Sequence, residues 1–573
     1  MNTEHTGCDV AVVGAGPAGM AAAVGARESG AESVLIIDRD PRLGGILPQC
    51  IHAGFGLEAF HRELTGPEYA EEYIGRLREM DVRCALDTTV LGVDSAGRLI
   101  LSSAARGIRT LSAKAVVLAM GCRERTRANI QVPGYRPAGV FTAGTAQRLI
   151  NMDGMMIGRR IVVVGSGDIG MIMARRCMLE GAEVPAVIEL LPHPSGLGRN
   201  VAQCLEDFDI PLYLNHRLTF IEGKERVSGV RFRETGGEGG EDGQEKKLDC
   251  DTVLLSVGLI PEIELAAQMG IPLDPCTGGP VVDNAMQTPV PGIFACGNLV
   301  QVYDLVDWVS EDGCEAGKSA ALYAGGELVP TAAGVPPGRA VRIEFDGGIR
   351  SVAPRLLKPY PHRSGRGTRV YVRMKHALKK PVFNLNVGGE TIGAIRKPFA
   401  VPAEIVCLEL EPYLDRVYQG GSLRIETQGE DLAYCSRGRT PGEITCVVCP
   451  FSCKVQVLRT GGTVEARGAG CERGRRYALA EAVDPRRVYT STVKLAGGRT
   501  PRLSVRSSRP IRKSDWKAAR RLTHALQVRA PVNKGQVVLH PFLEEGIRLV
   551  ATRGMDAAGA GEGGAEGEDA QHC

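Results

Sequence analysis

Apolar, β-branched runs that end in glycine-rich turns occur twice in the chain. Residues 9–19 read DVAVVGAGPAG and residues 160–170 read RIVVVGSGDIG. Each run predicts a buried strand, and each turn leads into an Ala- and Met-rich stretch that predicts a helix. In both places a second apolar strand follows and ends in an acid, Asp38 or Glu189, 19 residues after the third glycine. The matched spacing indicates an internal duplication of one strand–turn–helix–strand unit.

The pattern changes after the second unit. A helix-like segment covers 311–326, and Gly and Pro cluster at 325–338, which is typical of a linker. Residues 340–435 alternate short apolar and polar runs, which predicts a small β domain. A further module spans 441–553, and residues 554–573 are rich in Gly, Ala and acids, which predicts a disordered tail.

The two glycine turns have the sequence context that a dinucleotide site requires. The first glycine permits a tight turn, the second lets the backbone approach a pyrophosphate at the helix N-terminus, and the third allows close helix–strand packing. The acid can bind ribose hydroxyls, and Glu189 would repel a 2′-phosphate, which favours NAD(H) over NADP(H). The alternative to a dinucleotide site in the first unit is an ordinary glycine-rich turn. In the second unit the alternative is a domain that binds no nucleotide. The predicted nucleotide contacts are Gly14, Gly16, Gly19 and Asp38 in the first unit and Gly165, Gly167, Gly170 and Glu189 in the second.

The order of four segments resembles the two-dinucleotide flavoproteins of the pyridine nucleotide–disulfide oxidoreductase superfamily. The segments are the first unit, AVVLAMGCRER (115–125), the second unit and TPVPGIFACGN (288–298). The resemblance implies FAD in the first unit and NAD(P)H in the second. It also implies an α/β fold with two Rossmann-like domains, in which an FAD domain made from 1–125 and 280–330 contains an inserted nicotinamide domain, 126–279.

The same resemblance implies further flavin contacts. They are Gly44, Gly45, Gly121, Gly297 and Asn298. The family usually has Asp at the last of these positions, and Asn can still hydrogen-bond a ribityl hydroxyl or a phosphate.

The paired cysteines of the disulfide reductases are absent from the flavoprotein half of the sequence. Two solitary cysteines, Cys50 and Cys122, are the candidates for catalytic thiols near the flavin. The alternative is that both are small, packed side chains. The best acid–base candidates are His52, Glu58, His61 and Glu63. The alternative is that these are surface residues of a helix.

Longer segments carry a closer resemblance. GGILPQCIHAGFGLEAF and GNLVQVYDLVDWVSEDGCEAG look like bacterial flavoproteins associated with anaerobic glycerol-3-phosphate dehydrogenase, and are also similar to subunits of opine and related amine dehydrogenases. This resemblance covers about residues 1–430 and implies a partner dehydrogenase. The sequence shows no sugar-phosphate site.

Four cysteines in the C-terminal module have the spacing C-x2-C-x3-C-x17-C. They are Cys446, Cys449, Cys453 and Cys471. Three thiolates on one loop and a fourth from beyond a hairpin can surround a cubane with one ligand per iron. The motif resembles the N-terminal [4Fe-4S] domain of molybdopterin oxidoreductases, and the wider stretch resembles a small cysteine-motif family found beside such flavoproteins. Structural zinc and unliganded thiols are the alternatives.

Charge is distributed unevenly along the chain. Residues 434–553 hold 24 Lys and Arg against 8 Asp and Glu, although the net charge of all 573 residues is only +3. We expect this basic module to dock on an acidic partner or on the chain's own acidic half; solvated surface is the alternative. Nucleic acid is not expected, because aromatic residues are scarce there and no nucleic-acid motif is visible.

The sequence therefore predicts a flavoprotein enzyme, an FAD-dependent NAD(P)H oxidoreductase. Electrons would move between NAD(H), FAD and a C-terminal [4Fe-4S] centre, to or from a partner dehydrogenase or electron-carrier protein. Without an apolar run of about 18 residues or a secretory signal, we expect no transmembrane segment. An odd number of cysteines, 17, fits a reducing cytoplasm better than a disulfide scaffold. The oligomeric state stays open. The alternatives are a flavoprotein of the kind found in opine or amine dehydrogenases, as one of their subunits, and a zinc-stapled adaptor without enzymatic activity.

Overall fold

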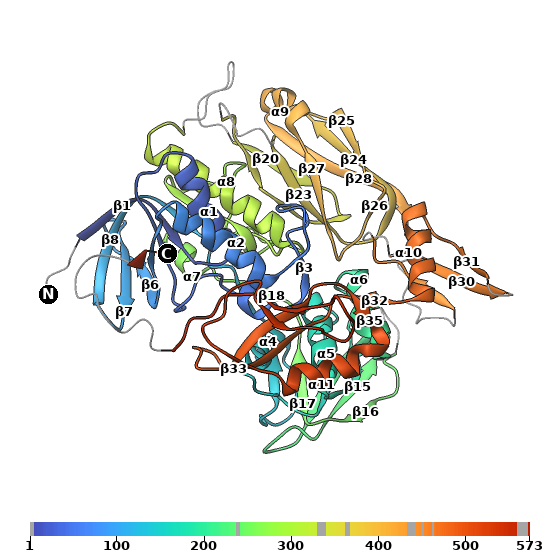
Figure 1. The fold of residues 1–573 in the computed structure, drawn as a ribbon. Coiled ribbons are helices and arrows are strands. Elements are labelled where there is room, and N and C mark those ends of the chain that lie inside the picture. The colour runs from blue at the N-terminus through green and yellow to red at the C-terminus, as the bar shows by residue number, and fades with distance from the viewer. Residues whose placement is uncertain are drawn as a thin grey trace.

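The computed structural model shows two α/β domains, a β domain and a C-terminal module (Figure 1). The described residues are 5–236, 241–328, 340–360, 367–432, 442–448, 452–460, 463–558 and 571–572. The module crosses the face of the second α/β domain, and the β domain adjoins the first. No helix within these residues is both long and apolar enough to span a membrane.

The first Rossmann domain is built on parallel strands in the order β5-β2-β1-β8-β19. Its strands and helices are β1 (His5–Val13), β2 (Val34–Ile37), β5 (Arg83–Ala85), β8 (Gly107–Leu118), β19 (Ile293–Ala295), α1 (Pro17–Glu28), α2 (Gly66–Glu79) and α8 (Val306–Ala324). Antiparallel strands β6 (Thr88–Val93) and β7 (Leu99–Ser103) extend the sheet. Strand β19 joins this sheet from far along the chain, which explains why the domain needs two separate segments.

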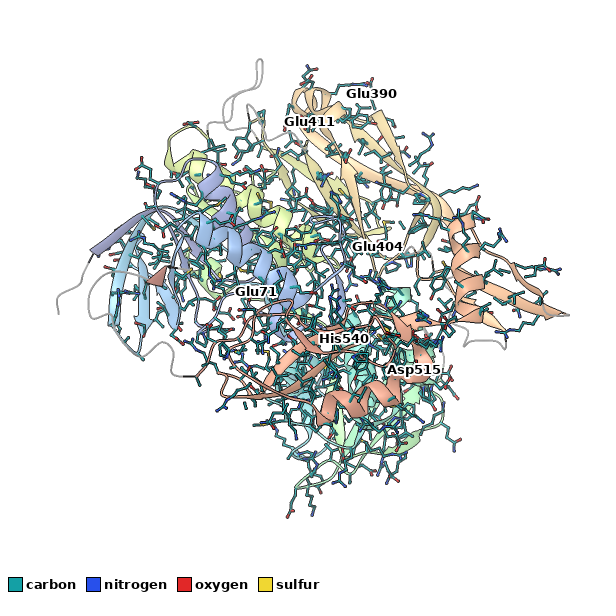
Figure 2. All side chains as sticks on the ribbon, in the orientation of Figure 1. Glu71, Glu390, Glu404, Glu411, Asp515 and His540 are labelled. Carbon is teal, nitrogen blue, oxygen red and sulfur yellow. The ribbon has the colours of Figure 1, made fainter. Side chains whose placement is uncertain are left out.

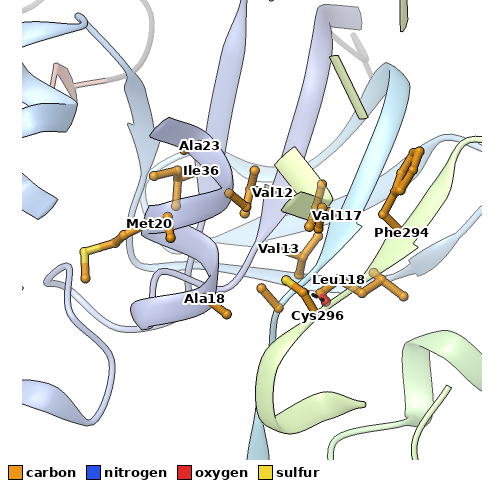
Figure 3. Packing of buried hydrophobic residues seen from close by; sticks show 14 of the residues in the cluster. Val12, Val13, Ala18, Met20, Ala23, Ile36, Val117, Leu118, Phe294 and Cys296 are labelled. Atoms are coloured by element: carbon orange, nitrogen blue, oxygen red, sulfur yellow. Dashed lines mark hydrogen bonds between the residues drawn. The ribbon is translucent and has the colours of Figure 1, made fainter. Parts of the chain in front are cut away.

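The core of this domain lies between the sheet and helices α1 and α8. Figure 3 shows Val12, Ile36, Val117 and Phe294 from four strands packed together with Met20 of α1. Small residues let the two helices touch. A Cβ added at Gly317 would lie 1.8 Å from the carbonyl oxygen of Ala22, so the close contact of α8 with α1 requires glycine there.

The second Rossmann domain repeats the first. Its strand order, β13-β12-β11-β17-β10, matches β5-β2-β1-β8-β19, and every pair is parallel. The elements are β10 (Val140–Thr142), α4 (Ala143–Asn151), β11 (Arg160–Val164), α5 (Asp168–Glu180), β12 (Glu183–Ile188), β13 (Leu212–Tyr213) and β17 (Thr252–Leu255). A three-stranded antiparallel sheet is added by β14 (His216–Glu222), β15 (Gly229–Glu234) and β16 (Lys246–Asp249). The prediction of two Rossmann-like units is confirmed.

The β domain consists of two antiparallel-rich sheets around one apolar core. One sheet contains β20 (Val341–Phe345), β22 (Leu356–Leu357), β24 (Leu378–Val387), β25 (Glu390–Arg396), β26 (Phe399–Ala400) and β28 (Ser422–Asp431). The other contains β21 (Ile349–Ala353), β23 (Arg369–Met374) and β27 (Ile405–Glu409). Helix α9 (Leu414–Gly420) lies against this core through Val417.

The C-terminal module has two parts. The cysteine lobe contains β29 (Glu443–Thr445), β30 (Lys454–Thr460), β31 (Thr463–Arg467) and α10 (Glu472–Val483). The sheet part has the order β36-β33-β34-β38-β37 and one helix. Its elements are β33 (Thr490–Ala496), β34 (Arg502–Ser507), α11 (Trp516–Ala525), β36 (Gln527–Arg529), β37 (Val537–Leu539) and β38 (Leu549–Ala551).

The end of the module differs from the pattern-based boundary. Met555 is buried in the module's core and its N–H donates to the carbonyl of Val532 at 2.8 Å. Ordered structure therefore continues past Arg553, because this apolar side chain fills the core. Gln571–His572 (β39) pairs with β5, whereas residues 559–570 and 573 of the predicted tail lie outside the described residues.

Candidate functional site

The first glycine turn joins β1 to α1. Gly14 has φ +107, which is strained for other residues, and its N–H donates to the carbonyl of Ile37 at 2.8 Å. A Cβ at Gly19 would lie 1.8 Å from the oxygen of Gly14, whereas one at Gly16 would meet nothing within 4 Å. Gly16 therefore leaves open space at the N-terminus of α1, where backbone N–H groups can bind a phosphate.

The acid after β2 closes this turn. Asp38 accepts from the N–H of Ala15 with one carboxylate oxygen and from that of Asp40, at 2.8 Å, with the other. Burial raises the pKa of Asp38. The carboxylate thus lies beside the turn, as a ribose ligand must.

The other predicted flavin contacts come from distant segments. The N–H of Gly44 donates to the carbonyl of Ala15 at 2.9 Å, and a Cβ at Gly45 would lie 2.8 Å from the Cα of Gly16. A Cβ at Gly297 would lie 2.7 Å from the Cβ of Ala18. These three glycines are therefore brought together around the start of α1.

Two further predicted contacts have different surroundings. Gly121 has φ +70 and open space around it, which is compatible with a ligand nearby. The side-chain oxygen of Asn298 accepts from the N–H of Tyr303 at 3.0 Å. Asn298 therefore holds the start of the loop that leads to α8, and its role toward a flavin stays a prediction.

The second glycine turn repeats the first in detail. The N–H of Gly165, with φ +91, donates to the carbonyl of Ile188 at 2.7 Å. Glu189 is 4% exposed, and its Oε2 accepts from the N–H of Ser166 at 2.8 Å, as Asp38 does from Ala15. Oε2 also accepts from the hydroxyl of Ser195 at 2.9 Å. The sequence motif did not single out Ser195, because this residue lies beyond β12, outside the motif.

The remaining glycines of the second turn face Ser256. A Cβ at Gly167 would lie 3.2 Å from its hydroxyl oxygen, and one at Gly170 would lie 2.6 Å from its Cβ. Gly170 therefore permits α5 to approach the end of β17 closely. In both units the glycine turn joins a strand to the helix that follows it, and the acid comes directly after the next strand.

The two solitary cysteines are buried or half-buried. Cys50 donates its S–H to Oε1 of Gln147 at 3.6 Å, and burial raises its pKa to about 12. Burial also raises the pKa of Cys122 to about 12. Both thiols therefore keep their protons at neutral pH, and a catalytic role for either stays a prediction.

His52, two residues after Cys50, is also neutral at pH 7. Burial lowers the pKa of His52 to about 4, and its ring lies 4.9 Å from that of Phe55. Glu58 accepts from the indole N–H of Trp308 at 2.8 Å. Neither residue is arranged as an acid–base pair in the described structure.

An acid–base candidate that no sequence motif singles out lies where the β domain meets the first Rossmann domain. Asp304 accepts from Nη2 of Arg373 and from the N–H of Ile405, both at 2.7 Å. These bonds hold the loop before β27, and Figure 2 shows Glu404 at this junction. Burial first, and then the nearby charge of Asp304, raise the pKa of Glu404 to about 7. A carboxyl that titrates near neutral pH at a domain junction is a candidate proton donor or acceptor.

Three of the four predicted metal ligands lie in the cysteine lobe near the start of α10. A Cβ at Gly474 would lie 3.3 Å from the sulfur of Cys446 and 3.7 Å from that of Cys471, and one at Gly470 would lie 3.0 Å from the sulfur of Cys453. Cys449 lies outside the described residues. Among the described side chains, no three Cys, His, Asp or Glu residues are grouped so as to hold a metal ion.

The basic module docks on the chain's own acidic groups. Arg487 and Lys513 pair with Asp207 at 3.1 and 2.5 Å. Lys534 pairs with Glu72 of α2 at 2.6 Å, so the module also contacts the first Rossmann domain. Of the two docking predictions, this structure supports docking on the chain's own acidic half.

A buried ion pair on α5 supports the same interface. Arg176 and Glu180 are 6% and 8% exposed and lie 2.5 Å apart, and Glu180 also lies 2.9 Å from Nε2 of His524 in α11. Arg176 contacts the hydroxyl of Ser491 at 3.4 Å. Burial alone would raise the pKa of Glu180, but the charges of Arg176 and His524 outweigh it, and the pKa is lowered.

Removal of the guanidinium should therefore weaken the fold. We expect Arg176→Ala to lower the free energy of unfolding by about 3–5 kcal/mol at pH 7, because it leaves the buried Glu180 carboxylate without its guanidinium partner. A carboxylate with a lowered pKa contributes stability that is lost as pH falls through that pKa, so the difference should shrink in acid. Urea unfolding at pH 7 and in acid measures both. Arg159→Ala, an exposed change, is the control; equal losses in the two variants would contradict the prediction.

Comparisons with known proteins agree with this architecture. A family model described as pyridine nucleotide-disulphide oxidoreductase matches residues 8–313, and a model for a protein of unknown function matches residues 472–553. One of the opine oxidase subunits of Rhizobium meliloti is 28% identical over 323 residues, which cover 51% of this chain and 58% of that one. Thioredoxin reductase of Mycolicibacterium smegmatis is 29% identical over 321 residues, 55% of this chain and 96% of that one.

A solved structure is also similar to part of the chain. The crystal structure of T. acidophilum thioredoxin reductase shares 27% identity with a TM-score of 0.46, over 56% of this chain and 99% of that chain. By contrast, the chain spans less than two thirds of the opine oxidase subunits that it matches.

Proposed function

The chain belongs to the pyridine nucleotide-disulphide oxidoreductase family, and on that premise we propose that it transfers electrons between NADH, FAD and a cysteine-ligated iron–sulfur centre. Oxidoreductase chemistry and binding of FAD and a pyridine nucleotide follow from the family. The observation that carries the two-nucleotide part is the repeat of one turn geometry, Asp38 with Ala15 and Glu189 with Ser166.

The residues of the first turn fit a flavin dinucleotide. Gly16 and Gly45 leave the N-terminus of α1 uncovered, and Asp38 lies ready for ribose hydroxyls. When bound, FAD accepts a hydride and can release its electrons singly. The protein's part is to orient the two nucleotides, and Glu404 is the proposed group that holds or releases a proton at the domain junction.

NADH is the proposed nicotinamide substrate. Glu189 is a buried, hydrogen-bonded acid, which can accept from ribose hydroxyls but would repel a 2′-phosphate. We expect Glu189→Ala to weaken the binding of NADH relative to that of NADPH by about 10–100-fold, the value of one charge-assisted hydrogen bond. Stopped-flow bleaching of the flavin by each nucleotide measures the ratio. Ser195→Ala, which keeps the carboxylate, should shift it less; an unchanged ratio in Glu189→Ala would exclude Glu189 as the ribose ligand.

An iron–sulfur centre is proposed for the cysteine lobe. The sulfurs of Cys446, Cys453 and Cys471 lie near the start of α10, within 3.0–3.7 Å of where a Cβ at Gly470 or Gly474 would stand. Ligands of a single zinc ion must lie around one atom, whereas a cubane offers a separate iron to each thiolate. The spacing C-x2-C-x3-C-x17-C favours the cluster, with Cys449 as the proposed fourth ligand.

A partner protein is also proposed. The matched Rhizobium meliloti protein is by name one of the subunits of an opine oxidase. We propose that this chain likewise exchanges electrons with a dehydrogenase or an electron carrier, the substrate being glycerol 3-phosphate or an opine. A zinc-stapled adaptor is the competing function, and the cytoplasm is the proposed location.

Anaerobic purification tests the proposal. We expect flavin absorbance together with a broad iron–sulfur shoulder, and NADH added under argon should bleach the flavin before the shoulder. Metal analysis should give iron and acid-labile sulfide. Zinc without iron would reject the cluster, and a flavin that neither NADH nor NADPH bleaches would reject the second nucleotide site.

A further inference from the structure

One carboxylate of the second Rossmann domain reaches into the cysteine lobe. Glu206 begins the short helix η3 (Glu206–Phe208), and its carboxylate accepts from the hydroxyl of Thr445 at 2.7 Å and from Nζ of Lys454 at 2.6 Å. Lys454 also donates to the hydroxyl oxygen of Thr445 at 2.7 Å. The three side chains therefore form a closed triangle between the two parts of the chain.

The two lobe residues in this triangle directly flank two predicted ligands. Thr445 precedes Cys446, and Lys454 follows Cys453. The backbone joins the same two positions, because the N–H of Cys446 donates to the carbonyl of Cys453 at 2.8 Å. Glu206 thus contacts the residues that flank Cys446 and Cys453.

The contact is better protected than a surface ion pair. The side chain of Glu206 is 16% exposed, that of Lys454 is 19% exposed, and Thr445 is buried. Charge-assisted hydrogen bonds in such surroundings are stronger than exposed pairs, which contribute little. Only a well-positioned carboxylate can accept from both partners at once.

The segment that carries Glu206 also leads back to the nucleotide turn. The segment contains Leu197 and Asn200 at its other end. The N–H of Leu197 and Nδ2 of Asn200 donate to Asp168, the first residue of α5, at 2.8 and 2.6 Å. Between the two ends lies a π-helical turn, η2 (Val201–Leu205), a geometry that occurs frequently at functional sites. One short segment therefore connects the start of α5 with the cysteine lobe.

We propose that Glu206 is a positioning residue, which fixes Cys446 and Cys453 relative to the second Rossmann domain. The inference rests on the proposed iron–sulfur function. Glu206 acts through Thr445 and Lys454 and does not touch the cluster itself. Without this carboxylate, Thr445 and Lys454 would lose their hydrogen bonds to the second Rossmann domain.

The anaerobic holoenzyme tests this role through cluster retention. Glu206→Gln keeps the size of the side chain but removes its charge, and we expect iron release to a chelator about 10-fold faster than in the wild type, as for an outer-shell partner. Bleaching of the flavin by NADH should be unchanged. Thr445→Val, which alters the triangle from the lobe side, should also accelerate release. Glu465→Gln is the matched control, because that carboxylate is 59% exposed and pairs with Arg467 of its own strand, β31.

The outcomes separate this inference from the proposed function. Equal release from Glu206→Gln and wild type, with equal flavin content, would overturn the positioning role. If the wild type contains no iron, the cluster proposal fails. Maleimide labelling of Cys446 and Cys453 in the metal-free chain then tests whether Glu206 positions these two residues. Faster labelling in Glu206→Gln than in Glu465→Gln would support it, and equal labelling would reject it.

Discussion

Gly16→Ala is expected to remove most of the bound FAD and leave the fold intact. Gly16 has φ −72, which alanine adopts readily, and the added Cβ meets no protein atom within 4 Å. The open space lies at the N-terminus of α1, where the pyrophosphate must approach the backbone. A methyl group there keeps the phosphate from the N–H groups, and the loss of one charge-assisted hydrogen bond corresponds to about 10–100-fold weaker binding.

Gly19→Ala is the informative counterpart. Its Cβ would lie 1.8 Å from the oxygen of Gly14, so the backbone of β1 or α1 would have to move. We expect this variant to lose FAD because the domain no longer folds, which circular dichroism and thermal unfolding will show. Flavin content after gel filtration measures binding in Gly16→Ala. Wild-type FAD content in that variant would contradict the assignment of the first turn.

Cys446→Ser is expected to abolish electron transfer to one-electron acceptors and to preserve reduction of the flavin by NADH. Serine retains the shape of the side chain but offers no thiolate to iron. Because loss of a ligand is more severe than loss of an outer-shell partner, which costs about 10–100-fold, acceptor reduction should fall by at least about 100-fold. The cysteine lobe is separate from both nucleotide turns, so the hydride step should continue.

The measurement compares iron content, the bleaching of the flavin and steady-state acceptor reduction in one preparation. Cys276→Ser is the control, because Cys276 is an exposed thiol outside the cysteine lobe. Cys471→Ser should behave as Cys446→Ser does. A Cys446→Ser protein with wild-type iron and acceptor activity would remove Cys446 from the ligand set.

Much of the nucleotide-binding architecture could be predicted because it depends on local sequence. Gly14 and Gly165 require a backbone conformation that few other residues adopt, and the apolar runs before them form buried strands of two parallel sheets. Local rules of this kind cannot say which distant segments complete a site. Gly297 lies close to Ala18 of α1, and α8, which follows Gly297 in the chain, packs on α1 through Gly317.

The surroundings of the chemically interesting side chains could not be predicted in the same way. Cys50 is buried against Gln147, and the pKa of Glu404 is raised by burial and by Asp304, which is distant in the sequence. Burial and the distance between charges depend on how the domains pack, and such effects decide whether a thiol or carboxyl is reactive.

The order of residues was enough to identify the two glycine turns, their acids and the four-cysteine spacing, because each follows from local backbone geometry and residue chemistry. The charge pattern also predicted an acidic surface for the basic module, with solvated surface as the alternative. The folded chain was needed to show that this surface is the chain's own, through Asp207 and Glu72, and that Glu206 reaches the residues beside Cys446 and Cys453. Those contacts join residues more than 200 positions apart, so they exist only once the domains have docked.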